Sequence, residues 1–255
     1  MILRGNVFSK VLEMETGISI LFSSSFDRSQ DYKVIYLIHG MCGDNSNWID
    51  YTMLPVYANN YNAIFVMPNI VRSFCADMKY GQKYFSYITE ELPEICKNIF
   101  NISARRENTI IMGNSMGGYA ALKCALSKPE NYGYCCAFSS DCLFMKEDLE
   151  KHPTIESFER DYGGQILRDF QAILGEDLKW SCENEILDLA QKIGSEKPVI
   201  FSTCGIEDYT IELNRRFASC MKDLGFEFIY EEWPGTHDFK FWDESLKRAL
   251  VKIFK

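Results

Sequence analysis

The sequence predicts an α/β fold: one mostly parallel central sheet with helices on both faces. Short apolar runs rich in β-branched residues alternate with longer segments whose apolar residues recur at helical spacing. The 255 residues, 47% hydrophobic and 25% charged, are enough for one domain with a full core and too few for two comfortable ones. Strands that alternate with helices favour parallel pairing under two helical layers.

The first half of the chain predicts a hairpin followed by strands and a broken helix. Residues 6–26 alternate apolar and polar side chains around Thr16-Gly17, as an N-terminal antiparallel hairpin would. Buried strands are expected at 33–40 and 62–68. Residues 84–100 have helical spacing, but Pro93 lies inside them and predicts a kink or a split helix, because proline lacks an N–H.

The second half predicts a return to strand and helix alternation around a helical insertion. Residues 141–196, after a strand that ends near Ser140, mix charged and aromatic residues without a convincing strand. We expect them to lie over one face of the sheet, within a single domain spanning residues 1–255. The other expected elements are strands at 109–112, 134–140, 198–205 and 226–232, and helices at 119–126, 211–224 and 242–254.

A Gly-x-Ser-x-Gly motif joins one of these strands to a helix. Gly113-Asn114-Ser115-Met116-Gly117 follows an apolar β-type run and precedes strong helix formers with no breaker before Pro129. Such a turn presents a serine hydroxyl on strained backbone, and glycines beside it leave the room it needs. Three fixed positions also recur by chance, and a serine here can be a helix N-cap. The strand, turn and helix context favours Ser115 as a nucleophile.

A serine nucleophile needs a base, and the chain has only 3 histidines. His39 ends a buried strand and is expected to be structural. His152 precedes Pro153 in the charged insertion and is expected to be solvated. His237 follows the last strand, and catalytic groups of open α/β sheets gather at the carboxyl ends of strands. His237 is therefore the predicted base.

The acid that orients this imidazole is expected in the loop after strand 198–205. Asp208 is preferred and Glu207 is the alternative, while Asp238 is expected to cap the C-terminal helix. The order Ser115, Asp208, His237 is that of an α/β-hydrolase fold. Two backbone N–H groups should bind the oxyanion, from the residue after the nucleophile and from the loop after the third strand: Met116 and Met41.

Several segments together resemble a known family. His39 to Asn45, Met67 to Asn69, Asp77 to Gly81, Gly113 to Tyr119 and Gly235 to His237 resemble the esterase D-like α/β-hydrolases, in particular bacterial tributyrin esterases. That family also contains S-formylglutathione hydrolases and feruloyl and acetyl-xylan esterases. The resemblance implies a metal-free carboxylesterase for short acyl esters, without a cofactor and with the triad above. Asn114 stands where many relatives carry histidine, and we expect its side chain to point away from the chemistry.

The substrate-binding residues are less well defined by the sequence. Trp48, Phe74 and Tyr80 lie near predicted strand ends and are candidates to line the pocket, with core or surface packing as an equal alternative. The insertion 141–196 is expected to be a partial lid that selects acyl length, the alternative being a plain surface excursion. Rival functions are a thioesterase such as S-formylglutathione hydrolase, a feruloyl esterase and a non-catalytic binding module.

Charge and cysteine usage limit the partners. The net charge of −9 argues against a nucleic-acid or anionic-membrane surface, so a small-molecule ester is the expected partner. The 10 cysteines have no Cys-x-x-Cys spacing, and many lie in apolar runs, which predicts buried free thiols. Those in apolar runs are Cys96, Cys124, Cys135, Cys136, Cys204 and Cys220. The first residues lack a basic segment followed by an apolar one, and no run of about 18 apolar residues occurs. We expect a cytoplasmic protein; whether it forms a homo-oligomer is left open.

Overall fold

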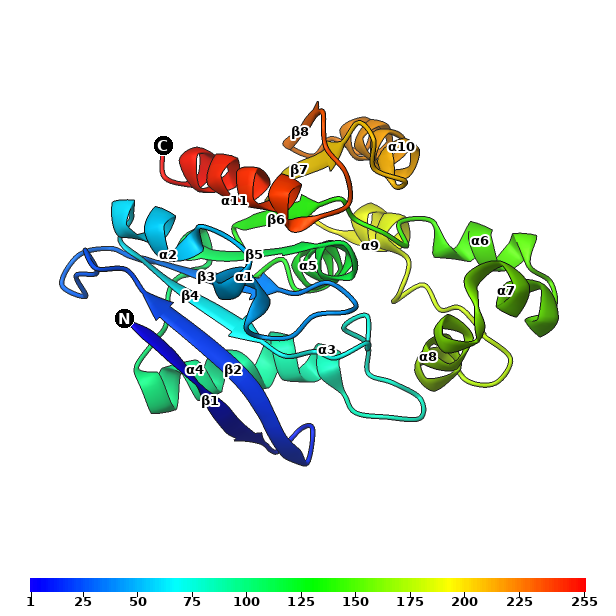
Figure 1. The fold of residues 1–255 in the computed structure, drawn as a ribbon, viewed down its shortest axis with the longest axis horizontal. Coiled ribbons are helices and arrows are strands. Elements are labelled where there is room, and N and C mark those ends of the chain that lie inside the picture. Colours follow the sequence, from blue (N-terminus) through cyan, green and yellow to red (C-terminus); the bar gives the residue numbers. More distant parts are fainter.

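A computed structural model describes residues 1–255 and contains one 8-stranded sheet with the order β1-β2-β4-β3-β5-β6-β7-β8 (Figure 1). β2 pairs antiparallel with β1 and β4, and all other neighbours are parallel. The mostly parallel α/β sheet predicted from the sequence is confirmed. The strands are β1 (Ile2–Ser9), β2 (Met14–Phe22), β3 (Lys33–Ile38), β4 (Ala63–Pro68), β5 (Thr109–Asn114), β6 (Tyr134–Phe138), β7 (Val199–Gly205) and β8 (Phe228–Trp233).

Helices cover both faces of this sheet. None of them combines the length and the apolar character that crossing a membrane requires. The helices are α1 (Asn47–Asp50), α2 (Leu54–Tyr57), α3 (Tyr84–Ser86), α4 (Leu92–Phe100), α5 (Met116–Ser127), α6 (Met145–Lys151), α7 (Ile155–Tyr162), α8 (Gly164–Leu174), α9 (Ile186–Lys192), α10 (Ile211–Asp223) and α11 (Phe239–Ile253), with short helical turns at Ala58–Asn60, Tyr87–Glu91 and Arg106–Asn108.

The two faces of the sheet form two separate hydrophobic cores. Along β3, Ile35 and Leu37 pack with α1, α2 and α11, whereas Val34 and Tyr36 pack with α4, α5 and α10. Successive side chains of a strand point to opposite faces, so a continuous apolar run is what a strand buried on both sides needs. This explains why the central strands carry almost no polar residues.

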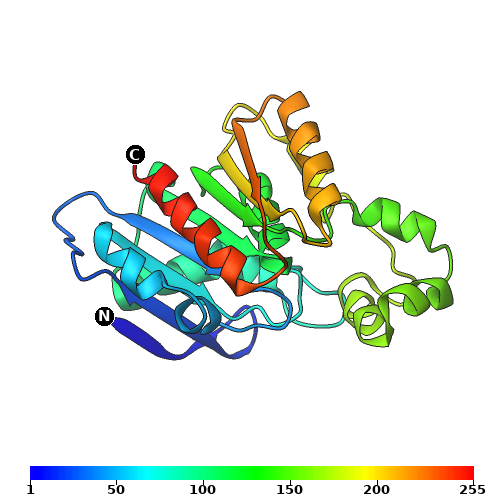
Figure 2. The ribbon, with the colours of Figure 1, turned by 45° about the horizontal axis from the view of Figure 1, so that its top comes forward.

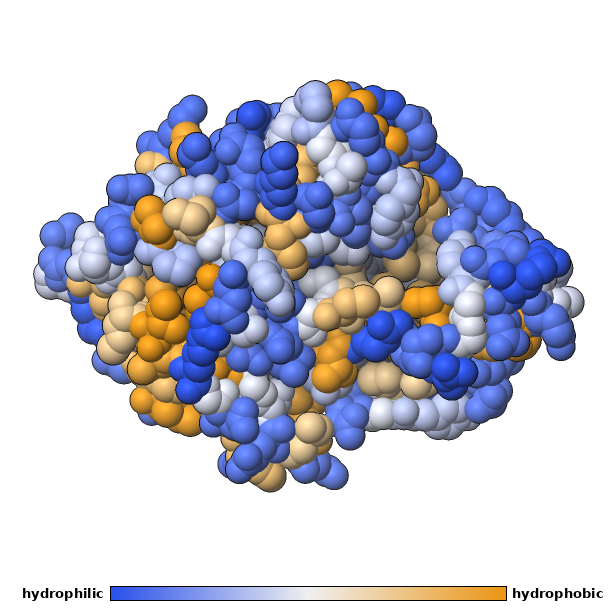
Figure 3. All heavy atoms as spheres, in the orientation of Figure 1, coloured by the Kyte–Doolittle hydropathy of each residue, from blue (hydrophilic) through white to orange (hydrophobic).

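The N-terminal hairpin is present, but its turn is not where the sequence suggested. The turn lies between Ser9 and Met14, and Thr16 and Gly17 are inside β2, where Gly17 pairs with Asn6. The prediction was wrong by several residues because β2 continues as a paired strand through the glycine. Figure 3 shows hydrophobic residues over this hairpin, and its exposed apolar side chains include Met1, Leu3 and Phe8.

The predicted break at Pro93 is confirmed. Tyr87–Glu91 forms a wider π-type turn between α3 and α4, and Pro93 is in the first turn of α4. Proline cannot donate to the carbonyl one turn back and its ring crowds that carbonyl. A locally widened helix accommodates both effects.

The insertion 141–196 forms α6 to α9 and contains no strand. α6, α7 and α8 form a lobe at one end of the molecule, away from the helices that cover the sheet (Figures 1 and 2). Its aromatic residues pack on one another: the ring of Phe158 is 4.6 Å from that of Tyr162 and 5.7 Å from that of Phe170. Phe158 and Phe170 belong to the same core as α4, α5 and α10, and Phe170 also packs on Phe74.

All 10 cysteines are free thiols. Cys220, expected to be buried, is only half-buried, and Cys42 and Cys182 are exposed.

Candidate active site

Ser115 lies at the sharp turn between β5 and α5. Its backbone has φ 54° and ψ −122°, a conformation that non-glycine residues rarely adopt. Its N–H donates to the carbonyl oxygen of Phe138 at 2.9 Å, which ties the turn to β6. A Cβ on Gly113 would overlap the carbonyl oxygen of Gly117, and one on Gly117 would overlap that of Ile38. Only glycine at both positions allows this turn.

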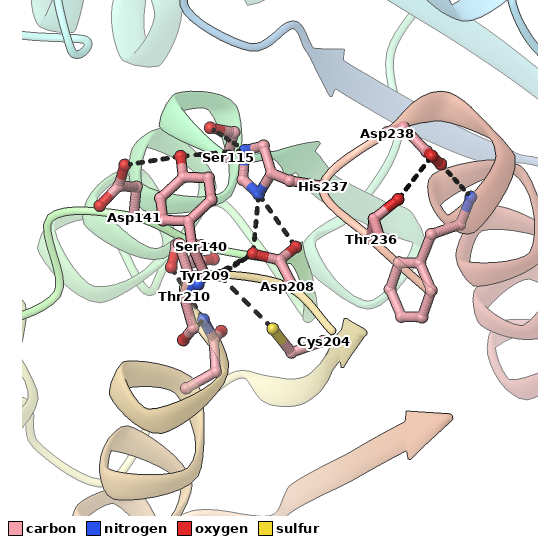
Figure 4. A network of polar contacts seen from close by, with 12 residues as sticks. Ser115, Ser140, Asp141, Cys204, Asp208, Tyr209, Thr210, Thr236, His237 and Asp238 are labelled. Carbon is pink, nitrogen blue, oxygen red and sulfur yellow. Dashed lines mark hydrogen bonds and ion pairs between the residues drawn. The ribbon is translucent and has the colours of Figure 1, made fainter. Parts of the chain in front are cut away.

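Three side chains form a continuous hydrogen-bonded line at the carboxyl ends of the strands (Figure 4). The Nε2 of His237 is 2.9 Å from the Oγ of Ser115. The Nδ1 of the same ring is 2.9 Å from Oδ2 and 3.1 Å from Oδ1 of Asp208. The geometry thus brings together Ser115, Asp208 and His237, which are separated by up to 122 residues in the chain.

Asp208 is placed to remain ionised. Its side chain has no exposed surface. Burial by itself raises its pKa, but hydrogen bonds from His237 and from the Thr210 N–H outweigh burial and lower the pKa of the carboxyl below its ordinary value. Thr210 donates to Oδ1 from both its N–H at 2.9 Å and its hydroxyl at 2.8 Å. The carboxylate is therefore held in one orientation towards the imidazole.

Glu207, the alternative acid, contacts the backbone instead of the imidazole. Its Oε2 accepts from the Gly235 N–H at 2.6 Å, and the Glu207 N–H donates to the Gly235 carbonyl at 3.1 Å. A Cβ on Gly205 would overlap that same carbonyl oxygen, so the two loops approach very closely here. Glu207 fixes the loop that carries His237.

The other two histidines lie elsewhere. His39 is 1% exposed, its Nδ1 is 2.7 Å from the Gly40 carbonyl oxygen, and its Nε2 accepts from the Ile70 N–H at 3.0 Å. Burial lowers its pKa, which suits a neutral structural ring. His152 bonds the Asp148 carbonyl and Asp161, and its side chain is 13% exposed. The expectation that it is solvated was wrong, because the rings of Phe158 and Tyr162 cover it.

Two backbone N–H groups near Ser115 do not take part in the hydrogen bonds of a helix or a strand. Met116 is the first residue of α5, so its N–H has no partner within the helix. Met41 lies outside helices and strands, and its N–H donates to no group of the protein. Met41 and Ser115 line the same cavity.

That cavity has a volume of about 310 Å³, and no lysine, arginine, aspartate or glutamate lines it. Asn114 is among the lining residues and is itself 1% exposed. The aromatic walls were not found from the sequence, because they come from loops that only the fold brings together. The lining residues are Gly40, Met41, Cys42, Gly43, Asn47, Tyr51, Asn114, Ser115, Tyr209, His237, Phe239 and Trp242.

None of the three predicted substrate-binding residues lines this cavity. Trp48 is 1% exposed, donates to the Ile38 carbonyl and packs against Phe138 in the core. Phe74 packs on Tyr119 and on Phe170 of the insertion, and Tyr80 is 57% exposed. The packing alternative was correct for all three: proximity to a strand end in the sequence does not decide which way a side chain points.

The insertion contributes no wall to the cavity either. Phe158 packs on Tyr162 and Phe170, and Phe170 packs on Phe74. The lid interpretation expected such residues to cover Ser115, but none of them lines its cavity. Asp141 of the insertion accepts a hydrogen bond from the Tyr209 hydroxyl at 3.2 Å.

Tyr209 is a further residue of the site that the sequence did not single out. Its ring centroid is 4.6 Å from that of His237, and its hydroxyl is 3.4 Å from Nε2 (Figure 4). Tyr209 remains 69% exposed, so it covers the imidazole from the solvent side. Its position directly after Asp208 was the one available signal.

A serine, an imidazole and a carboxylate in this order and spacing are the arrangement used by serine hydrolases of the α/β-hydrolase fold. Comparison with known proteins agrees. The chain matches the Esterase family model, described as "Putative esterase", over residues 9–253. It is 29% identical over 268 residues to the acetyl esterase of Caldicellulosiruptor saccharolyticus, covering 100% of this chain and 98% of that protein.

Solved structures extend this likeness. Staphylococcus aureus fluorophosphonate-binding serine hydrolase F superposes with a TM-score of 0.83 at 25% identity, covering 100% of this chain and 98% of that one. An S-formylglutathione hydrolase (FrmB) from the same organism gives 0.82 at 24% identity, covering 100% and 99%, and shows the shared fold. The chain belongs to the Esterase family. It is a serine esterase, as the resemblance to esterase D-like proteins predicted.

Proposed function

We propose that this esterase hydrolyses small, uncharged carboxylic esters with short acyl groups such as acetyl or butyryl, through an acyl-enzyme on Ser115. In this proposal His237 is the general base, Asp208 orients its imidazole, and the N–H groups of Met41 and Met116 bind the oxyanion.

The proposed reaction follows from the order of the hydrogen bonds. Nδ1–H of His237 faces Asp208, so Nε2 carries the lone pair and accepts the proton of Ser115 as Oγ attacks the ester carbonyl. The carbonyl oxygen becomes negative and accepts from the two N–H groups. The C–O bond to the alcohol breaks as His237 returns the proton to the departing oxygen. Water then attacks the acyl-enzyme by the same route, and the acid is released.

The observation that carries the substrate class is the lining of the cavity. No lysine, arginine, aspartate or glutamate is in its wall. Glutathione carries two carboxylates and an ammonium group, and a site selective for it is expected to offer countercharges. A neutral alcohol needs none. The volume of about 310 Å³ is at the small end for ligand sites, so a short acyl group together with its alcohol fills it.

A panel of substrates tests this proposal. Hydrolysis of p-nitrophenyl acetate, butyrate and octanoate, of methyl ferulate and of S-formylglutathione would be compared by kcat/KM. Each methylene excluded from an apolar pocket changes selectivity by about 1–3 kcal/mol, so the short esters should exceed octanoate by at least about tenfold. A higher kcat/KM for S-formylglutathione or for the ferulate would overturn the assignment. Loss of fluorophosphonate labelling in Ser115→Ala would locate the nucleophile.

A further inference from the structure

A second and larger cavity lies behind the helix that carries Ser115. Its volume is about 660 Å³, within the range of small-molecule sites, and it shares no lining residue with the cavity at the triad. Its walls come from the loop before α3, the carboxyl-terminal half of α5, the end of α8, and α9 with the segment before it. The insertion 141–196 thus lines part of this cavity and no part of the one at Ser115.

The cavity is basic, although the whole protein carries a net charge of −9. Five lysines line it and only two carboxylates, those of Asp77 and Glu183. Asp77 already accepts hydrogen bonds from the backbone and hydroxyl of Ser86. Of the lysines, Lys128 forms an ion pair, with Glu90. The other four have no carboxylate within ion-pair distance: Lys79, Lys123, Lys179 and Lys192.

Lys123 is the most informative of these lysines. It is 4% exposed, on α5, and its ammonium donates to one protein acceptor, Oδ1 of Asn184, at 2.7 Å. It also lies 5.4 Å from the centre of the Phe85 ring. An ammonium has three N–H groups, and buried charges in proteins are normally paired with an opposite charge. Burial lowers the pKa of Lys123, as expected for an ammonium that lacks a counterion.

Hydrophobic side chains line the cavity as well, beside Ser127, Pro129, Ser181, Asn184 and Gly194. They are Phe85, Leu126, Ile173, Leu174, Leu189 and Ile193. A cavity lined by both lysines and hydrophobic side chains is complementary to a molecule that carries one anionic head on a hydrocarbon body.

Lys123 is buried without a carboxylate partner, and the same cavity holds further lysines without one and hydrophobic side chains. From these observations we infer a second ligand site, for an amphiphilic organic anion whose carboxylate or phosphate contacts Lys123. Lys79, Lys179 and Lys192 surround the anionic head from the solvent side, and the hydrocarbon body packs on Ile173 and Leu174 of α8. The site is independent of the proposed ester chemistry, because it uses none of its residues.

Calorimetric titration of the full chain tests the inference, with octanoate, octyl phosphate, 1-octanol and inorganic phosphate as probes. We expect saturable binding of at least one octyl anion, at least tenfold tighter than that of octanol or of inorganic phosphate. The tighter of the two octyl anions identifies the preferred head group. Equal binding of octanol, equal binding of inorganic phosphate, or no binding of either octyl anion would each overturn the inference.

Variants locate the site. Lys123→Met keeps the length and the apolar stem of the side chain and removes the ammonium group. It should weaken binding of the octyl anion at least tenfold, while hydrolysis of p-nitrophenyl acetate continues at the wild-type rate. Lys33→Met is the control, since Lys33 is a half-buried lysine that also lies near aromatic rings but is outside the cavity. Should Lys123→Met fail to fold, the exposed double variant Lys79→Glu/Lys192→Glu should show the same tenfold loss. Unchanged affinity in the folded variants would place the anion elsewhere and refute the site.

Discussion

Replacing Asp208 by asparagine tests the proposed triad most sharply, because the structure predicts how the amide will orient. Oδ1 of Asp208 accepts two hydrogen bonds from Thr210, whereas Oδ2 faces only His237 Nδ1. An asparagine therefore keeps its oxygen towards Thr210 and turns its NH₂ group towards the imidazole. Nδ1 must then be the acceptor and Nε2 carries the hydrogen. In that tautomer His237 cannot accept the proton of Ser115.

The expected effect of Asp208→Asn is a loss of roughly 10⁴ in kcat, about 5.5 kcal/mol in the activation barrier, which is the scale known for a triad held in the wrong tautomer. The melting temperature should change little, because both Thr210 hydrogen bonds persist. Initial rates with p-nitrophenyl acetate measure the loss. Glu207→Gln is the matched control: its amide oxygen can still accept from Gly235 N–H, so activity should stay near wild type. More than a tenth of wild-type kcat in Asp208→Asn, or a larger loss in Glu207→Gln, would refute the tautomer argument.

Four further outcomes are expected. Ser115→Ala and His237→Ala should each lower kcat by roughly 10⁴ to 10⁶, and the double variant should lose little more, because the groups act as a unit; additive losses would show that they act separately. Tyr209→Phe should lower kcat/KM less than about tenfold, since the Tyr209 hydroxyl is a solvent-exposed donor. Tyr209→Ala should lower kcat/KM further, because it uncovers His237. A larger loss in Tyr209→Phe than in Tyr209→Ala would assign chemistry to the hydroxyl. Activity should persist in EDTA and in reducing agent, and a loss restored by zinc would contradict this. Burial raises the pKa of Glu185 to about 6, so the folded state binds this proton more tightly than the unfolded state. Ionisation of Glu185 therefore opposes folding. The stability of the protein falls as pH rises from about 4.5 to about 6 and then stays level. Glu185→Gln should therefore stabilise the protein by about 2 kcal/mol in urea unfolding at pH 8 and not at pH 4, and equal effects at both pH values would contradict the sign.

The local pattern of the sequence was sufficient to predict the fold and to select the three residues that the structure brings into hydrogen-bond contact. Apolar runs of strand length, separated by helices, predict a parallel sheet because a strand buried on both faces must be apolar throughout. The Gly-x-Ser-x-Gly motif reports a backbone conformation, and the overlap that a Cβ would make at Gly113 and Gly117 is the reason for its glycines. With 3 histidines in the chain, elimination was enough to propose His237, and the structure brings it to Ser115.

Only the tertiary structure decided which side chains surround that serine. Trp48 and Phe74 are close to strand ends in the sequence, but in the fold both pack against other aromatic side chains. Tyr51 and Trp242 line the cavity instead, and they come from separate segments of the chain. The insertion has the composition expected of a lid, but composition does not determine which part of the protein a segment packs against. In the fold its residues line a cavity together with Lys123 of α5 and Lys79 of the loop before α3. Contacts between residues far apart in the chain depend on how whole elements pack, and local propensity contains no information about that packing.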